Sequence, residues 1–314
     1  MTTKRTAIRE RFTNYIHNLQ EKICKALEEA DGKAVFQEDR WSRAGGGGGV
    51  TRVLSGGELL EKAGVNISTV HGKLPEEIRG HFGVEQGWFF AGGLSLVLHP
   101  ESPMIPTVHA NVRLFELYED PSRETVSDRW FGGGTDLTPY YLFEEDAVHF
   151  HEVLKKVCDR HDEGLYPIFK KECDTYFYNH HRNEARGVGG IFFDYLREDE
   201  GVSDEDWYRF VTDVGNHVLD SWLPIARRRS DESYGDEQRY WQEIRRGRYV
   251  EFNLIHDRGT LFGLRTNGRV ESILMSLPPR VRWDYNHQPE PGSPEEKLLE
   301  RLKEPVEWLT GDRE

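Results

Sequence analysis

The chain has 314 residues, of which 37% are hydrophobic and 12% aromatic, so it can bury the core of one large domain or of two ordinary ones. Its formal net charge of -14 argues against nucleic acid or an anionic membrane surface as the main partner. The sequence contains no long apolar run and no signal-peptide core, and its 3 cysteines form no C-x-x-C pair. We therefore expect no integral membrane segment. We expect the protein to be in the cytoplasm, with the mitochondrial intermembrane space as the alternative.

The first segment with a clear period is amphipathic. Apolar residues recur every three or four positions from Ile8 to Leu27, and Asp31-Gly32 interrupts the pattern. This spacing predicts a helix over about residues 5–30, with one face buried.

Five consecutive glycines occupy residues 45–49, between short predicted strands at residues 34–36 and 50–54. A phosphate-binding loop follows a strand and opens a helix, whereas this run leads into a strand-like segment. Nucleotide binding is therefore disfavoured. The glycines fit a mobile lid or a close approach of two backbone segments better.

Two neighbouring segments, residues 94–99 and 108–114, alternate between two kinds of side chain, as half-buried strands do. The segment between them contains three prolines, which cannot continue a strand ladder but can stiffen a loop, so the two strands are predicted to form a hairpin. Side chains two positions apart on a strand lie roughly 6.5–7 Å from each other. If the polar faces coincide, one surface carries Ser95, His99, His109, Asn111 and Arg113.

This row combines groups that can exchange a proton, an amide and a fixed cation, which suits the binding of an anionic organic molecule. The same pattern is also typical of the solvated face of a half-buried antiparallel sheet. The alternation by itself leaves both interpretations open.

Four helices are predicted in the middle of the chain, at about residues 144–161, 165–182, 203–222 and 236–246. The third begins at Ser203-Asp204-Glu205-Asp206, which has the form of a capping box. These helices are expected to cover a sheet.

The last third is predicted to return to strands. Apolar and polar residues alternate over residues 250–255, and the segments 261–265 and 270–277 flank Thr266-Asn267-Gly268-Arg269. An Asn-Gly pair between two such segments is typical of a hairpin turn.

A final helix is expected after Ser293, where proline occupies the first turn and Glu296 completes a capping box. No repeat, low-complexity linker or domain seam divides the chain. The elements together indicate an α+β fold, with a large, mostly antiparallel β-sheet flanked by α-helices in a single domain over residues 1–314.

A second glycine-rich segment, Trp130 to Pro139, is predicted to be a turn that ends near Asp136. This carboxylate either caps the turn or serves a ligand. No Gly-x-Ser-x-Gly motif is present, and the cysteines have no evident basic neighbourhood, so covalent nucleophilic catalysis is not indicated. Arginine and histidine on strands, with one aspartate, suit the binding of carboxylates and the transfer of protons.

The 13 histidines also raise the question of a metal. His149 and His151 diverge on a helix, and the adjacent His180 and His181 diverge similarly, so neither pair faces one ion easily. One member of each pair could join other histidines in space. A mononuclear metal oxygenase therefore stays open as an alternative.

Several long motifs resemble those of the oxygen-dependent coproporphyrinogen III oxidases. The resemblance extends from about Trp41 to Trp283, and the motifs follow one another in the family's order. They are GLSLVLHP at residues 93–100, PTVHANVR at 106–113, FGGG with DLTP at 131–139, HRNE with RG and GG at 181–190, and EFNL at 251–254 through LP at 277–278.

The resemblance implies oxidative decarboxylation in haem biosynthesis. Two propionates of coproporphyrinogen III would become the vinyl groups of protoporphyrinogen IX, with O2 as oxidant and with carbon dioxide and hydrogen peroxide as products. It further implies no organic cofactor, a divalent metal in only some members, and a homodimer to which strands at about residues 249–277 contribute.

The resemblance also implies roles for single residues. His109 matches the proposed proton donor, and Arg113 is expected to hold the reacting propionate through a two-pronged contact. The matched substrate-binding positions are Ser95, Asn111, Val112, Arg113, Asn267, Gly268 and Arg269. The positions matched to metal ligands in some members are His99, His109, His151 and His181.

Chemistry suggests how such residues suffice. A porphyrinogen is rich in electrons, and loss of a pyrrole N–H proton would make it reactive toward O2. We expect Asp136 to accept hydrogen bonds from the pyrrole nitrogens and His109 to move the proton. Arg269 would anchor another propionate, and the glycine-rich segments would close over the ring. A porphyrin carrier without catalysis is the third hypothesis.

Overall fold

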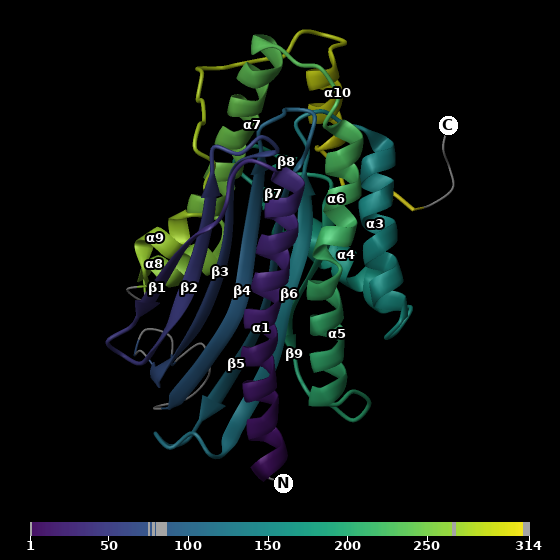
Figure 1. Cartoon of the computed structure of the whole chain (residues 1–314). Helices are drawn as coiled ribbons and strands as arrows, with labels where there is room; N and C mark the ends of the chain where they lie inside the picture. The colour runs from purple at the N-terminus through teal and green to yellow at the C-terminus, as the bar shows by residue number, and fades with distance from the viewer. Residues whose placement is uncertain (1, 75, 77–78, 80–86, 266–267, 310–314) are drawn as a thin grey trace.

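The computed structural model describes residues 2–74, 76, 79, 87–265 and 268–309. Within them, one antiparallel sheet has the strand order β1-β2-β3-β4-β5-β6-β9 (Figure 1). The strands are β1 Gln37–Ser42, β2 Gly47–Ser55, β3 Leu60–Lys73, β4 Trp88–Pro100, β5 Thr107–Tyr118, β6 Val126–Thr138 and β9 Gly189–Leu196. A separate small ribbon pairs β7 Tyr178–Asn179 with β8 Glu184–Ala185.

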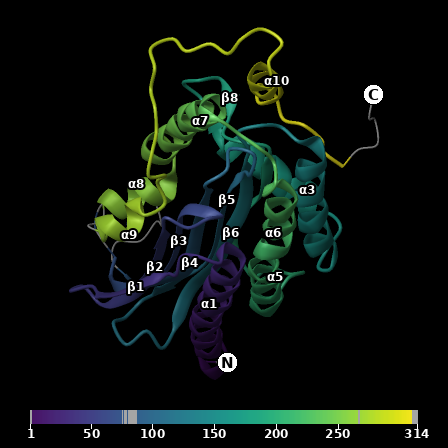
Figure 2. The ribbon, with the colours of Figure 1, turned by 45° about the horizontal axis from the view of Figure 1, so that its top comes forward.

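Helices lie on both sides of this sheet (Figure 2). On one side are α1 Thr2–Asp31, α3 Glu144–Asp159, α4 Leu165–Tyr176, α5 Asp204–Asn216 and α6 Val218–Arg229. Toward the other side lie α7 Asp236–Ile255, α8 Arg258–Arg265 and α9 Val270–Leu274, and α10 Pro294–Arg301 packs near the upper end of α7. The predicted α+β fold is confirmed. Among the described residues, no helix combines the length and apolar composition needed to cross a membrane.

The first predicted helix is confirmed, because its apolar face is the one that packs on the sheet. Phe12, Ile16 and Leu27 on α1 are fully buried. Leu96 on β4 and Val108 on β5 are also fully buried in the same core. Side chains alternate across a strand, so burial of these residues turns their sequence neighbours toward the opposite face.

The predicted hairpin is also confirmed. Strands β4 and β5 pair antiparallel, with Ser95 opposite Asn111 and Gly93 opposite Arg113. Leu94 is 3% exposed and faces the core that the sheet forms with α1 and α3 to α6. We call this side of the sheet its helix-covered face. The other face of β4 and β5, which we call the polar face of the sheet, therefore carries the polar row.

The predicted strands at residues 249–277 are wrong, since the described part of this segment forms α7, α8 and α9. Three apolar-polar pairs fit a short strand as well as one side of a longer helix. In α7 the core-facing residues include Trp241, Ile244 and Phe252, at helical spacing, whereas Leu254 is 42% exposed. Packing over 20 residues outweighs a local alternation of six.

The predicted turn at Thr266-Asn267-Gly268-Arg269 joins two helices, and positions 266 and 267 lie outside the described residues. The Gly268 N–H donates to the Gly263 carbonyl at 2.8 Å, a contact that closes the end of α8.

The predicted glycine-rich turn at residues 130–139 is likewise wrong, because most of it belongs to strand β6, which lies between β5 and β9. A Cβ on Gly132 would lie 2.5 Å from Arg113 Nε, so this glycine gives the arginine room to lie on the sheet. In the run 45–49, a Cβ on Gly49 would lie 2.2 Å from the Ile67 carbonyl oxygen. The close approach, rather than a free loop, explains these glycines, three of which belong to β2.

Other boundaries differ in smaller ways. Residues 34–36 precede β1 instead of forming a strand, and the helix predicted at 165–182 ends at Tyr176. The helix at 203–222 is divided at His217 into α5 and α6. The Ser203 capping box is present. Ser293 caps α10, but the predicted capping box is not formed there, because the Glu296 side chain accepts from the Gly292 N–H. The long strand β3 and the short strand β9 were not predicted.

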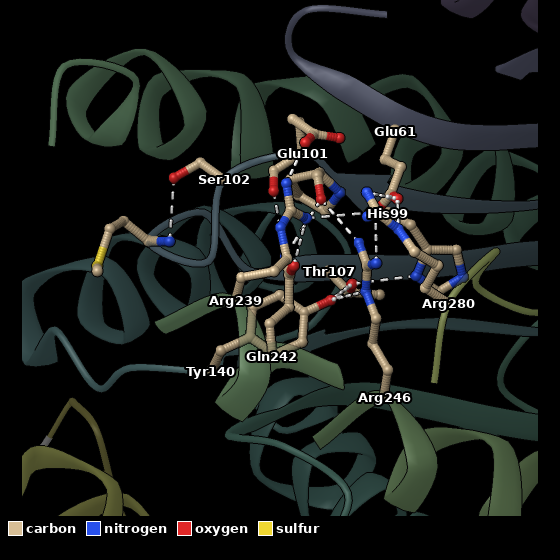
Figure 3. A network of polar contacts seen from close by, with 12 residues as sticks. Glu61, His99, Glu101, Ser102, Thr107, Tyr140, Arg239, Gln242, Arg246 and Arg280 are labelled. Carbon is tan, nitrogen blue, oxygen red and sulfur yellow. Dashed lines mark hydrogen bonds and ion pairs between the residues drawn. The ribbon is translucent and has the colours of Figure 1, made fainter. Parts of the chain in front are cut away.

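Helix α7 is attached to the sheet by a buried network of ions (Figure 3). Glu61 on β3 accepts hydrogen bonds from Arg246 on α7 and from Arg280. The Arg246 side chain is 1% exposed and also donates to the Pro100 carbonyl at 2.8 Å and the Tyr140 hydroxyl at 3.2 Å. A buried charge requires such partners, so this network fixes α7 above β3 and β4.

Candidate active site

A cavity of about 290 Å³ lies between the polar face of the sheet and helices α7 to α9. Strands β3, β4 and β5 form its floor, and α7, α8 and α9 contribute its cover. Tyr176 at the end of α4 and Phe192 on β9 close one side. Such a volume is at the lower end of the range for small-molecule sites.

The polar row of β5 lines this cavity as a group. His109, Asn111 and Arg113 lie at alternate positions of β5, and Ser95 lies beside Asn111 on β4. Of the five residues predicted to share one surface, these four lie together at the cavity, whereas His99 does not border it. Val112 also borders the cavity, although its side chain is buried on the helix-covered face.

His109 and Asp136 are cross-strand partners on β5 and β6. His109 Nδ1 lies 2.9 Å from Asp136 Oδ1 and donates to it, which leaves Nε2 as the proton-accepting nitrogen of the neutral ring. Asp136 is 1% exposed. Burial alone would raise the pKa of Asp136, but Arg186 and His109 hold it below its ordinary value, so the carboxylate is ionised.

Arg186 neutralises Asp136 through two contacts. Its Nη2 donates to Oδ1 at 2.6 Å and its Nε donates to Oδ2 at 3.1 Å. Its Nη1 donates to Asn253 on α7 at 2.8 Å, and the guanidinium lies over the Phe177 ring at 4.1 Å. Arg186 is brought to Asp136 because the Val188 N–H pairs with the backbone of β6.

Asp136 does not line the cavity, so the expected direct contact with pyrrole nitrogens does not fit its position. Both of its oxygens accept hydrogen bonds from His109 and Arg186. The carboxylate on the cavity wall is Asp257, next to the end of α7. Burial would raise the pKa of Asp257, but hydrogen bonds from Thr260 and Tyr176 lower it below its ordinary value.

Arg113 is held in place while part of it stays accessible. Its Nη1 donates to Asn111 Oδ1 at 3.0 Å, and its Nη2 lies 3.0 Å from Asp194 Oδ2. The side chain is 37% exposed. Arg113 therefore pairs with Asp194 and still lines the cavity, where part of its side chain is accessible.

Two residues of the second substrate-binding segment inferred from the resemblance, Gly268 and Arg269, are described, and neither borders the cavity. Arg269 pairs with Asp39 on β1, at 2.5 Å, and Gly268 packs against Gly263. Asn267 lies outside the described residues.

The four histidines expected as metal ligands do not form one site. His99 contacts the Ser276 carbonyl at 2.8 Å, and His151 contacts the Val188 carbonyl at 3.0 Å from the helix-covered side of the sheet. His181 is bound to Glu251 and His256 at 2.8 and 2.9 Å. In the described part of the chain, no group of three or more His, Cys, Asp or Glu side chains is arranged to hold a metal. The four residues lie apart because they come from both sides of the sheet.

Sequence reasoning missed the helical wall of the cavity. Tyr249, Asn253 and Asp257 line it, and they follow one another at intervals of four residues. That interval places side chains on one face of a helix, so the signal was present but required the helical interpretation of this segment. Arg186 stands in a recognised motif, yet only the pairing of β6 with the following segment reveals its partner.

Comparison with known proteins shows the family of this chain. The family model described as Coproporphyrinogen III oxidase matches residues 11–308. The chain is 51% identical over 313 residues to the oxygen-dependent coproporphyrinogen-III oxidase, chloroplastic, of Glycine max. This alignment covers 97% of this chain and 80% of that relative. Coproporphyrinogen-III oxidase 1, chloroplastic, of Arabidopsis thaliana is 48% identical with the same coverage. The chain belongs to the coproporphyrinogen III oxidase family.

Proposed function

We propose that this protein catalyses the oxygen-dependent oxidative decarboxylation of coproporphyrinogen III to protoporphyrinogen IX, in haem biosynthesis. Family membership supports the reaction, and the position of the His109–Asp136 pair at the cavity carries the assignment of the site. In each step a propionate side chain, O2 and one proton give a vinyl group, carbon dioxide and hydrogen peroxide. Two electrons pass from the porphyrinogen to O2.

The net reaction takes up a proton, and His109 is suited to supply it. Histidine exchanges protons near neutral pH, and Nε2 is the ring nitrogen that Asp136 leaves available. Asp136 acts through His109 by holding the ring and by stabilising its protonated form. The electron-rich macrocycle and O2 supply the redox chemistry of this proposal, which includes no organic cofactor.

The substrate carries four propionates and approaches a protein of net charge -14, so binding requires local cations. Arg113 supplies such a cation on the cavity wall. A second guanidinium, that of Arg258, lies 3.8 Å from the Asp194 carboxylate, which Arg113 also contacts. Asp257 lines the cavity as an ionised carboxylate, and its oxygens, which accept from Tyr176 and Thr260, keep lone pairs for pyrrole N–H donors. A tetrapyrrole fills the cavity in this arrangement and extends beyond it.

The same proposal includes a homodimer formed through α7 to α9. Apolar side chains are exposed along this cover, which is typical of an interface. Burial of the three cysteines without a disulfide fits the cytoplasm as the proposed compartment. The exposed apolar residues are Leu254, Ile255, Phe262, Leu264 and Val270.

The decisive experiment incubates purified protein with coproporphyrinogen III in air and measures carbon dioxide, peroxide and O2 uptake. We expect one carbon dioxide and one peroxide for each vinyl group formed. Tight porphyrinogen binding without O2 uptake would instead identify a carrier. A chelator series with metal analysis separates the metal oxygenase, whose activity would fall with its metal content.

Arg113→Lys is expected to lower kcat/KM about 10- to 100-fold, mainly through KM, because an ammonium cannot reproduce the planar contact of a guanidinium with a carboxylate. Arg197→Lys is the control, since Arg197 pairs with Asp128 outside the cavity. Steady-state kinetics of both variants provides the measurement. Near-normal kinetics of Arg113→Lys would remove Arg113 from the substrate site.

A further inference from the structure

We infer that Asn66 on β3 is a substrate-binding residue that donates a hydrogen bond to a propionate carboxylate. This inference rests on the proposed function. It adds a binding position on a strand that the sequence did not identify. The evidence is the orientation of the Asn66 amide and its place in the cavity.

The orientation of Asn66 follows from a chain of hydrogen bonds behind it. The Thr51 hydroxyl donates to Asn66 Oδ1 at 2.7 Å. It accepts from Trp41 Nε1 at 3.2 Å, and an indole N–H can only donate. Thr51 also lies 2.8 Å from Ser272 Oγ on α9, which completes the chain. The amide oxygen of Asn66 is therefore used within the protein, and its NH2 group is left for the cavity.

The neighbours of Asn66 make the same end of the cavity polar. Asn66 lies opposite Ser95 on β4, which lies opposite Asn111 on β5. Ser68, two positions along β3, also lines the cavity. In the described part of the chain, no protein group accepts a hydrogen bond from Asn66 Nδ2.

The chemistry of the substrate decides which of its groups this amide binds. Asn66 presents N–H donors, since its oxygen is occupied by Thr51. A porphyrinogen offers pyrrole N–H donors and carboxylate acceptors, and only the carboxylates can accept from Asn66. Asn66 lies two strands from His109, which corresponds to about 10 Å across the sheet. It is thus placed for a propionate other than the one beside His109.

A matched control lies on the opposite face of the same strands. The Gln20 side chain of α1 donates to the Val50 and Val65 carbonyls at 2.9 and 2.8 Å. Both of its N–H groups serve the fold, whereas those of Asn66 face the cavity. Gln20→Ala is therefore expected to lower stability and leave substrate affinity unchanged.

The test compares Asn66→Ala, Asn66→Asp, Thr51→Val and the Thr51→Val/Asn66→Ala double variant with the wild type. Anaerobic titration with coproporphyrinogen III gives Kd, turnover in air gives KM and kcat, and thermal unfolding gives stability. Asn66→Ala is expected to raise Kd and KM about tenfold, with the effect on KM rather than kcat. Thr51→Val should raise Kd less, and it should add nothing in the Asn66→Ala background.

Asn66→Asp separates the two groups of the substrate. If the partner is a propionate, an aspartate repels it, and Asn66→Asp binds the substrate more weakly than Asn66→Ala. If the partner is a pyrrole N–H, the aspartate accepts from it, and Asn66→Asp binds at least as well as the wild type. The second result would overturn the inference, as would an unchanged Kd in Asn66→Ala. Failure of the wild type itself to bind coproporphyrinogen III would refute the proposed function instead.

Discussion

Asp136→Asn is expected to lower kcat about 10³- to 10⁴-fold while Kd for coproporphyrinogen III changes little. An amide has one accepting oxygen, so it cannot replace both carboxylate oxygens that Arg186 contacts, and it provides no negative charge to stabilise a protonated His109. Loss of the aspartate from other hydrogen-bonded His–Asp pairs has an effect of this size. Substrate affinity is preserved because Asp136 does not line the cavity.

Steady-state kinetics and anaerobic titration of Asp136→Asn provide the two measurements. Asp128→Asn is the control, since Asp128 lies on the same strand and pairs with Arg197 at a partly exposed position. Equal losses of turnover and affinity would show that Asp136 serves folding or binding. Asp136→Ala should also reduce stability by about 3–5 kcal/mol, because Arg186 would stay buried without a countercharge.

Glu61→Gln is expected to reduce the free energy of unfolding by about 3–5 kcal/mol at neutral pH. The change removes the charge that compensates Arg246, whose side chain is 1% exposed, and weakens the contact with Arg280. Since these contacts attach α7 to β3, substrate affinity should fall together with stability. Urea unfolding and anaerobic titration of the variant measure the two effects.

The pH dependence of stability provides a second check on Glu61. Burial would raise its pKa, but Arg246 and Arg280 lower it below the ordinary value of 4.5. The stabilisation is therefore complete above about pH 4.5 and is lost as the pH falls through the lower pKa of the folded state. The difference between wild type and Glu61→Gln should shrink in acid.

Glu205→Gln is the matched control for Glu61→Gln. Glu205 pairs with Arg11 through side chains that are 35% and 46% exposed. Exposed pairs contribute about 1 kcal/mol or less, so this variant should be nearly as stable as the wild type. A Glu61→Gln variant that behaves like Glu205→Gln would show that the buried network does not hold α7.

The strand face and the helical cover meet at the cavity and contribute different groups to it. The strand face supplies the groups that contact substrate in our proposal, including His109, Arg113 and Asn66. The helical cover supplies a wall and, through Asn253, a contact to Arg186 behind the floor. Our proposal thus places binding and proton transfer on rigid strands, which hold side chains more precisely than loops do.

Long, regular patterns were sufficient for part of the fold and part of the site. The apolar period of α1 continues through several turns, and the alternation in β4 and β5 leaves one face for the core. His109 and Arg113 are four positions apart on one strand, so the period of two determines from the sequence alone that they share a face. It could not distinguish a cavity wall from a solvated sheet face.

Only the tertiary structure decided the partners of Asp136, the helical nature of α7 to α9 and the role of the buried arginines. Asp136 is opposite His109 through strand register, and Arg186 reaches Asp136 from 50 residues further along the chain. The short alternation at residues 250–255 suited two structures, and burial of Trp241 and Phe252 selected the helix. Local sequence reports which face of an element is apolar, whereas contacts between distant elements depend on packing that no local pattern contains.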